Sequence, residues 1–188
     1  MGASETKCKK LLQSEIDFLR KNTSFSEQEI HQWYTSFRKD CPDGRLTKTQ
    51  FVSIYNTLWP EGNADKLCEH VFRAFDNDGN GYIDFKEFML SVNCVTNGSP
   101  EDKLKLAFKM YDIDQNGSVD KDELKEIIRS ICSIAGAQEC NINPDVVTNN
   151  VFSKIDVNHD GMISEEEFVR VCSTDEELVK LLTTFGIV

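Results

Sequence analysis

Acidic side chains recur with the same internal spacing in three twelve-residue segments of this chain. The segments cover residues 76–87, 112–123 and 156–167. Each has oxygen-bearing side chains at positions 1, 3, 5 and 9, Gly at position 6, a β-branched residue at position 8 and Glu at position 12. Ca²⁺ is a hard cation that takes about six to eight oxygen ligands, and this spacing supplies them from one turn. The sequence therefore predicts three calcium loops.

Each loop position has its own physical role. Positions 1, 3 and 5 provide side-chain oxygens, position 7 a backbone carbonyl, position 9 often a contact through water, and position 12 both oxygens of a Glu. Gly at position 6 lies where the chain turns sharply and a Cβ would be strained. A solvated acidic turn would account for one such segment, but three copies in register argue against chance. The expected ligands are Asp76, Asp78, Asn80, Tyr82, Asp84 and Glu87; Asp112, Asp114, Asn116, Ser118, Asp120 and Glu123; and Asp156, Asn158, Asp160, Met162, Ser164 and Glu167.

Ligand charge differs among the three loops. Four carboxylates occupy liganding positions in loop 76–87 and four in loop 112–123. Loop 156–167 has three, because Asn158 stands at position 3 and Ser164 at position 9. On ligand charge alone we expect loop 156–167 to bind Ca²⁺ most weakly, with all three in the sensor range of about 10⁻⁷–10⁻⁵ M.

A fourth copy of the repeat, at residues 39–50, lacks the acidic ligands expected at positions 1, 3 and 12. Lys39 stands at position 1, Cys41 at position 3, Pro42 at position 4, Gly44 at position 6 and Gln50 at position 12. A cation and a thiol replace two carboxylates, and the closing Glu has become an amide. We expect no Ca²⁺ here, and we expect the segment to persist as a packing partner for its neighbour.

Apolar residues at helical spacing flank all four loops, which start at 39, 76, 112 and 156. This internal repeat predicts an all-α fold of four EF-hands in two pairs. Ile83, Val119 and Ile163 at position 8 suit short two-stranded β-bridges between paired loops. We expect an N-terminal pair at 1–96, a linker around 96–100, and a C-terminal pair with a final helix at 97–188.

Local sequence also marks where several helices begin. A helix over residues 11–22 would place Leu12, Ile16 and Leu19 on one face. N-cap residues indicate three further starts. These are Ser26 with Glu29 as a capping box, Ser99 before Pro100, and Asn143 before Pro144.

Composition excludes several classes of function. A net charge of −11 over 188 residues argues against nucleic acid as a partner. Seven Cys with no CxxC pair and no signal peptide favour reduced thiols in the cytoplasm. No apolar run is long enough to cross a membrane. His31, His70 and His159 share no metal or triad pattern, so we do not expect an enzyme.

The N-terminus matches the pattern for N-myristoylation. Gly2 would be the acceptor after removal of Met1, and Lys7, Lys9 and Lys10 follow. One myristoyl chain binds a membrane only marginally, and a nearby basic cluster can supply the second signal. The competing interpretation is a frayed terminus. The pattern favours peripheral membrane association.

The chain resembles the neuronal calcium sensor family, which includes recoverin, neurocalcin, frequenin and the guanylate cyclase activating proteins. The resemblance rests on Gly2 in its acylation context, residues 32–34 (QWY), residues 40–42 (DCP) with Gly44, and residues 72–88. Residues 151–158 are similar to the cyclase activators and residues 70–73 to neurocalcin, and Leu106 stands where many relatives have Trp. The branch within the family therefore stays open.

The resemblance implies a sensor that releases its myristoyl group on binding Ca²⁺ and uncovers an apolar groove for a membrane and a target. The target would present an amphipathic helix, for example from a kinase, a cyclase or a channel. A guanylate cyclase regulator and a passive calcium buffer are the alternatives. Mg²⁺ is a second candidate occupant without Ca²⁺, and homodimerisation stays open. The groove residues expected are Trp33, Phe37, Phe51, Ile54, Tyr55, Phe85, Phe88 and Val92.

Overall fold

The computed structural model of the chain describes residues 10–58, 65–134 and 143–183. These residues are mostly helical and include two short antiparallel strand pairs, which confirms the expected all-α class with β-bridges. The helices are α1 (Gln13–Asn22), α2 (Glu27–Asp40), α3 (Lys48–Leu58), α4 (Asp65–Phe75), α5 (Phe85–Asn97), α6 (Pro100–Tyr111), α7 (Lys121–Ile134), α8 (Pro144–Ile155), α9 (Glu165–Cys172) and α10 (Glu176–Thr183). The strands are β1 (Leu46–Thr47), β2 (Tyr82–Ile83), β3 (Ser118–Val119) and β4 (Ile163–Ser164).

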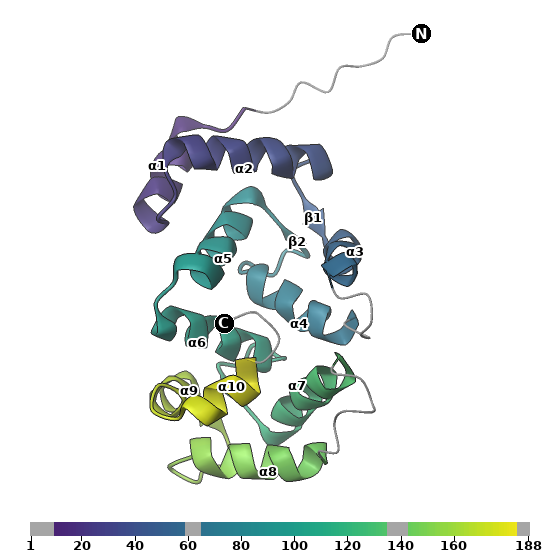
Figure 1. Cartoon of the computed structure of the whole chain (residues 1–188), viewed down its shortest axis with the longest axis vertical. Coiled ribbons are helices and arrows are strands. Elements are labelled where there is room, and N and C mark those ends of the chain that lie inside the picture. Colours follow the sequence, from purple (N-terminus) through teal and green to yellow (C-terminus); the bar gives the residue numbers. More distant parts are fainter. Residues whose placement is uncertain (1–9, 59–64, 135–142, 184–188) are drawn as a thin grey trace.

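The two halves of the chain are stacked along the long axis of the molecule (Figure 1). α2 lies at one end, α8 at the other, and α4, α6 and α7 between them. β1 pairs with β2 and β3 with β4, so each pair joins two loops of the same half. Leu46 faces Ile83, and Val119 faces Ile163. Apolar residues at position 8 therefore pair, as predicted, and all four are buried.

Local capping explains several helix starts. The Ser26 hydroxyl accepts from the Glu29 N–H at 3.3 Å, and the Glu29 carboxylate accepts from the Ser26 N–H at 2.8 Å. This reciprocal pair satisfies two N–H groups that the first turn leaves without partners. Ser99 caps α6 in the same way through Asp102, and the Asn143 side chain caps α8. All three predicted starts are confirmed.

Two expectations about the helices were wrong. Leu12 does not belong to an apolar face of α1, because it precedes the helix as its N-cap and is 56% exposed. Its N–H donates to Glu15 Oε2 at 2.8 Å, which makes it a capping residue, while Ile16 and Leu19 are buried. The linker is also shorter than predicted, because α5 continues through Asn97 and only residues 98–99 separate it from α6.

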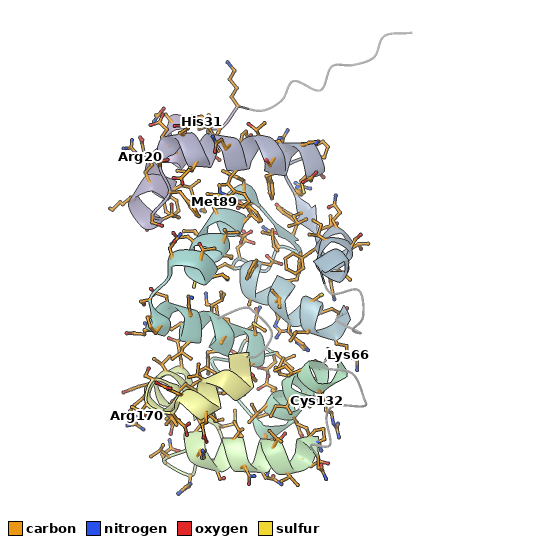
Figure 2. The ribbon with its side chains drawn as sticks, viewed as in Figure 1. Arg20, His31, Lys66, Met89, Cys132 and Arg170 are labelled. Carbon is orange, nitrogen blue, oxygen red and sulfur yellow. The ribbon has the colours of Figure 1, made fainter. Side chains whose placement is uncertain are left out.

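Each half of the chain has its own apolar core. In the first half, Ile30 and Phe37 of α2 pack with Phe85 and Met89 of α5. Met89 is fully buried and lies between these two helices (Figure 2). In the second half, residues of α6, α7, α8 and α9 form a larger cluster, to which α10 adds Leu178 and Leu182. A lone EF-hand would leave these faces in water, so pairing the hands forms the cores.

Two further properties follow from the described residues. None of the described helices combines the length and the apolar character that crossing a bilayer requires. Among the described residues, the thiols of Cys41, Cys94 and Cys172 are free.

A third apolar cluster joins the two halves. Leu67, Val71 and Ala74 of α4 pack against Leu106 and Met110 of α6. All five side chains are buried, so separating the halves would expose this surface to water. The first and second halves therefore share a packed apolar contact.

His70 of α4 is buried beside this contact. Its Nδ1 lies 3.1 Å from Arg73 Nη1, and because a guanidinium only donates, Nδ1 accepts. The ring proton is then on Nε2, which lies 3.8 Å from the largely exposed carboxylate of Glu126. Burial, reinforced by the charge of Arg73, lowers the pKa of His70 to about 4. The ring is neutral at physiological pH.

We expect acid to weaken the fold through His70. The pKa in the folded protein lies below the ordinary value of 6.5, so the unfolded state binds the proton first. The contribution of neutral His70 to stability is complete above pH 6.5 and is lost as the pH falls toward 4, amounting to about 2 kcal/mol between pH 7 and pH 5. Urea denaturation of the metal-free protein at both pH values measures this loss. The matched control is His70→Gln, and an equal loss in that variant would contradict the prediction.

Candidate metal sites

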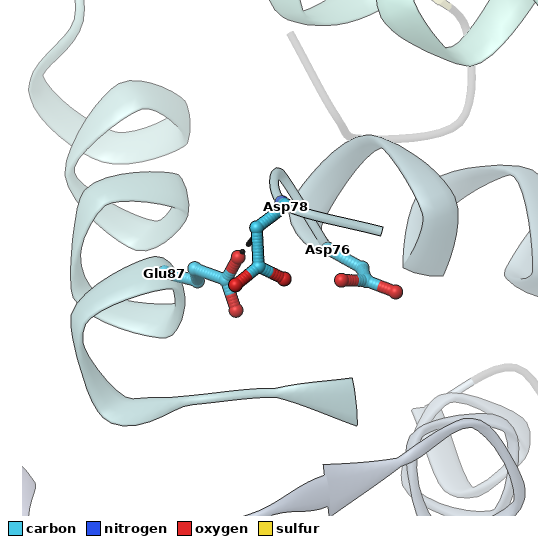
Figure 3. Close-up of side chains that lie close together, drawn as sticks. All are labelled: Asp76, Asp78 and Glu87. Carbon is cyan, nitrogen blue, oxygen red and sulfur yellow. Dashed lines mark hydrogen bonds between the residues drawn. The ribbon is translucent and has the colours of Figure 1, made fainter. Parts of the chain in front are cut away.

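Loop 76–87 places three carboxylates close to one another. Asp76 follows the last turn of α4, and Glu87 lies in the first turn of α5. Carboxylate oxygens of Asp76, Asp78 and Glu87 all lie within 4.8 Å of one another. Figure 3 shows the three side chains converging between the two helices. Asp76 and Glu87 are each only 7% exposed, so the two ends of the loop hold buried negative charges close together.

Backbone N–H groups fix the orientation of these carboxylates. Asp76 Oδ2 accepts from the Gly81 N–H at 2.9 Å. Glu87 Oε1 accepts from the Asp78 N–H at 3.2 Å, and Oε2 accepts from the Asp84 N–H at 3.0 Å. Glu87 Oε1 also accepts from the Asn77 N–H at 3.0 Å, whereas Asp76 Oδ2 and Glu87 Oε2 each have one such bond and keep a second lone pair for a cation. The loop is therefore organised around oxygens that can still accept.

Loop 112–123 repeats this arrangement. Carboxylate oxygens of Asp112, Asp114 and Glu123 lie within 4.8 Å of one another. Asp112 Oδ2 accepts from the Gly117 N–H at 3.0 Å, and Glu123 Oε2 accepts from the Asp120 N–H at 2.8 Å. Asp112 and Glu123 are both buried. The corresponding atoms thus form the corresponding bonds in the two loops.

Loop 156–167 keeps the same frame with less charge. Asp156 and Glu167 are 6% and 7% exposed. Asp156 Oδ2 accepts from the Gly161 N–H at 3.1 Å, and Glu167 Oε2 accepts from the Ser164 N–H at 3.1 Å. Asn158 stands where the other loops have a second Asp. Two buried carboxylates and a neutral amide therefore occupy the positions that hold three carboxylates elsewhere.

The closing glutamates experience different surroundings. Burial raises the pKa of Glu87, and the charges of Asp84 and Asp78 add to this rise against backbone hydrogen bonds. Burial acts on Glu167 in the same direction, but hydrogen bonds led by the Ser164 hydroxyl outweigh it and hold the pKa of Glu167 below its usual range. Hydrogen bonds therefore stabilise the charged form of Glu87 less than that of Glu167. This difference favours a stronger electrostatic attraction of a cation to loop 76–87.

The backbone of each intact loop has positive φ at two positions. Position 6 was expected to need glycine, and the requirement for positive φ at position 4 was missed in the sequence. Pro42 at position 4 of segment 39–50 has φ fixed near about −65°, so that segment cannot adopt the same turn. The residues with positive φ are Gly79, Gln115 and His159 at position 4 (φ 67°, 60° and 59°) and Gly81, Gly117 and Gly161 at position 6 (φ 85°, 87° and 84°).

Segment 39–50 keeps part of the backbone arrangement of a calcium loop but lacks the carboxylates at positions 1, 3 and 12. Gln50 Oε1 accepts from the Thr47 N–H at 2.9 Å, which preserves the capping role of position 12. Cys41 at position 3 is 2% exposed. Arg38 Nη1 lies 2.7 Å from the place where a Cβ on Gly44 would stand. A guanidinium therefore covers this turn, which opposes cation binding there.

The donor set of the intact loops fits Ca²⁺ better than a softer metal. Every proposed ligand offers oxygen, and no Cys or His is among them. In loops 76–87 and 112–123, three carboxylates, two of them buried, each bring an oxygen within 4.8 Å of the others and repel one another, so a cation between them relieves the repulsion. The carboxylates at positions 1 and 12 are buried and hydrogen-bonded to backbone N–H groups, so their oxygens are positioned without a bound cation.

The predicted groove residues fall into two groups. Trp33 and Phe37 of α2 face Phe85 and Phe88 of α5, with ring centroids 5.7 Å apart for Trp33–Phe88 and 5.5 Å for Phe37–Phe85. Phe37 and Phe85 are buried, whereas Trp33 is 38% exposed. The ring centroid of Tyr34, which was not among the predicted groove residues, lies 4.9 Å from that of Phe85. Two of the expected lining residues are thus core residues in this structure.

The second group lies on α3 and the end of α5. Phe51 packs edge-on against Phe72 and Phe75 of α4, at centroid distances of 5.8 Å and 5.9 Å. Ile54 is 50% exposed, and Val92 is half-buried. The side chain of Tyr55 and all of Gly2 lie outside the described residues.

Comparisons with known proteins place this geometry in a family. Family models described as an EF-hand domain pair match residues 42–93 and residues 101–173. Human recoverin is 35% identical over 89% of this chain and 86% of its own length. Guanylyl cyclase-activating protein 1 of Gallus gallus is 40% identical over 84% and 79%, and neuronal calcium sensor 1 of Lymnaea stagnalis is 37% identical over 93% of each chain.

The two family models extend over both halves of the fold. The paired EF-hands and the converging acidic groups together indicate calcium binding. The expectation that the chain is not an enzyme is confirmed by the same relatives. The chain belongs to the neuronal calcium sensor family, and it is a calcium sensor built from paired EF-hands.

Proposed function

We propose that this chain is an N-myristoylated sensor in the cytoplasm that binds Ca²⁺ at three EF-hands and exposes an apolar groove to regulate a membrane-associated target. One observation carries the proposal. In loops 76–87, 112–123 and 156–167 the carboxylates at positions 1 and 12 are buried and held by backbone N–H groups, whereas segment 39–50 has neither carboxylate. The two structural units would be the hand pairs at 1–96 and 97–188.

The ligands would be the side chains and carbonyls predicted from the sequence. A bound Ca²⁺ ion supplies a compact double positive charge that balances the buried carboxylates. The loops lose part of their mutual repulsion when that charge is present, and the helices at both ends are free to repack. Mg²⁺ is the candidate occupant in the Ca²⁺-free state, since it also takes oxygen ligands but demands a tighter octahedral geometry.

The proposed output is the aromatic surface between α2, α3 and α5. Trp33 and Ile54 are already exposed at its edge. Phe37 and Phe85 are buried between α2 and α5, so these helices must separate before the groove is complete. An opened groove would take the apolar face of an amphipathic target helix. The proposed target is a kinase, a cyclase or a channel at the membrane.

Membrane association would depend on Gly2. A myristoyl chain there with the adjacent lysines supplies the two weak signals that stable binding requires. Homodimerisation is a further arrangement that light scattering of both metal states would measure.

We expect calorimetry to find three Ca²⁺ ions per chain and none at segment 39–50. Glu87→Gln, Glu123→Gln and Glu167→Gln should each abolish one binding event or weaken it by tenfold or more, which is about 1.4 kcal/mol or more. Loop 156–167 should be the weakest, because it has the least ligand charge. Gln50→Ala is the matched control and should leave all three events in place. Four ions in the wild type, or loss of the tightest event in Glu167→Gln, would contradict this.

We expect Ca²⁺ to increase binding of the acylated chain to liposomes and to a hydrophobic resin. Gly2→Ala should abolish liposome binding but leave Ca²⁺-dependent resin binding, because the two depend on different parts of the molecule. The triple Glu87→Gln, Glu123→Gln, Glu167→Gln variant should respond to Ca²⁺ in neither assay. If Ca²⁺ changes neither assay in the wild type, the chain is a passive buffer.

A second candidate is supported by the 40% identity to a guanylyl cyclase-activating protein over 84% of this chain. In that case the Ca²⁺-free form would stimulate a membrane cyclase and Ca²⁺ would end the stimulation. Cyclase activity of membranes that contain a guanylyl cyclase, with added protein at low and saturating Ca²⁺, measures this. We expect at least twofold stimulation without Ca²⁺ if this chain is a cyclase regulator, and absence of stimulation in both states would assign it to another target.

A further inference from the structure

Two cations cross between the halves of the chain in opposite directions. Arg73 lies near the end of α4, which leads into loop 76–87, and its Nη2 donates to the Met110 carbonyl at 2.7 Å. Met110 is in the last turn of α6, which leads into loop 112–123. Lys109 of the same turn points back, and its Nζ donates to Asn77 Oδ1 at 2.8 Å. Arg73 is thus held at the end of the helix that leads into loop 112–123, and Lys109 is held at loop 76–87 itself.

The surroundings of Arg73 suggest that its charge matters more than its packing. The side chain is partly buried, which lowers the pKa of its guanidinium, and the carboxylates of Asp112 and Glu123 oppose this shift. Its Nε is buried and has no hydrogen-bond partner among the described residues. A buried donor without a partner is destabilising, so an apolar side chain would serve packing better.

Lys109 faces the other loop. It lines a cavity of about 490 Å³ together with Asp78, Asp84 and Glu87 of loop 76–87. Lys109 is exposed, so solvent and salt screen its charge more than that of Arg73. We therefore expect the larger effect from Arg73.

The two helices that carry these cations, α4 and α6, also pack against each other. The apolar cluster of α4 and α6 places buried side chains of both helices in direct contact. Loop 76–87 is bridged by strands only to segment 39–50, which lacks ligands. The contact between α4 and α6 is therefore the direct route between loop 76–87 and another intact loop.

We propose that Arg73 and Lys109 form a reciprocal latch that lowers the calcium affinity of the loop each one faces and couples loops 76–87 and 112–123 to each other. The inference rests on the proposed function in requiring that both loops bind Ca²⁺. The negative charge of a metal-free loop favours the cation that the Met110 carbonyl or Asn77 holds beside it, and so restrains the helix that enters the other loop. A bound Ca²⁺ removes that negative charge, so the hold weakens and the other helix can adjust. The coupling is positive and must be equal in both directions.

The test compares Arg73→Gln and Lys109→Gln with Lys103→Gln, which makes the same charge change at the other end of α6. Calorimetry with Ca²⁺ alone is done on the full chain and in Glu87→Gln/Glu167→Gln and Glu123→Gln/Glu167→Gln backgrounds, which leave loop 112–123 and loop 76–87, respectively, as the intact loop. Arg73→Gln should raise the affinity of loop 112–123 about fivefold and lower the Hill coefficient toward one. Lys109→Gln should raise the affinity of loop 76–87 by a smaller factor, and high salt should reduce both effects.

Two further measurements separate charge from structure. Arg73→Lys keeps the charge and should retain most of the coupling. In the presence of a calcium chelator, the Arg73→Gln variant should unfold at a lower temperature than the Lys103→Gln variant. The reason is that the carboxylates of loop 112–123 lose the nearby positive charge of Arg73. Wild-type affinities and cooperativity in Arg73→Gln, or changes equal to those of Lys103→Gln, would overturn the inference. Absence of Ca²⁺ binding at either loop in the wild type would instead overturn the proposed function.

Discussion

The structure depends on buried negative charges that the chain holds close together at both ends of a short turn. Asp76 and Glu87, like their counterparts in the other intact loops, are almost fully buried. In a protein with a net charge of −11, this arrangement concentrates repulsion at a few points. Backbone N–H groups offset part of that repulsion without neutralising it. The turns can therefore be stable without metal and still gain from a cation, which is what a reversible sensor needs.

A loop that lacks the carboxylates of positions 1, 3 and 12 still has a structural role. Segment 39–50 has Gln50 in place of the closing Glu, and the amide oxygen accepts the same N–H from position 9. Leu46 still pairs with Ile83, and Phe37 and Cys41 still contribute to the core of the first half. The packing role of an EF-hand and its ligand role are therefore separable. Loss of ligand charge removes the second and leaves the first.

Much of the fold and of the candidate sites could be predicted from the sequence because their signals are local. The capping box at Ser26 lies within four residues, and the pairing of Val119 with Ile163 follows from the same position 8 in two copies of the repeat. The position of Leu12 was wrong because periodicity alone does not distinguish an N-cap from a first helical turn. Positive φ at Gln115 was missed because neither its charge nor its size marks it.

Contacts between the halves could not be predicted, because they join residues far apart in the sequence. Nothing local to Arg73 indicates that its guanidinium reaches the carbonyl of Met110. The burial of His70 likewise depends on the second half of the chain closing over α4. These contacts connect loops 76–87 and 112–123, although the strand bridges assign the two loops to different pairs. Segment 39–50, to which loop 76–87 is bridged, has no carboxylate at position 1 or 12, so a response shared between loop 76–87 and another intact loop would have to pass through contacts between the halves, of which the α4–α6 contact is one.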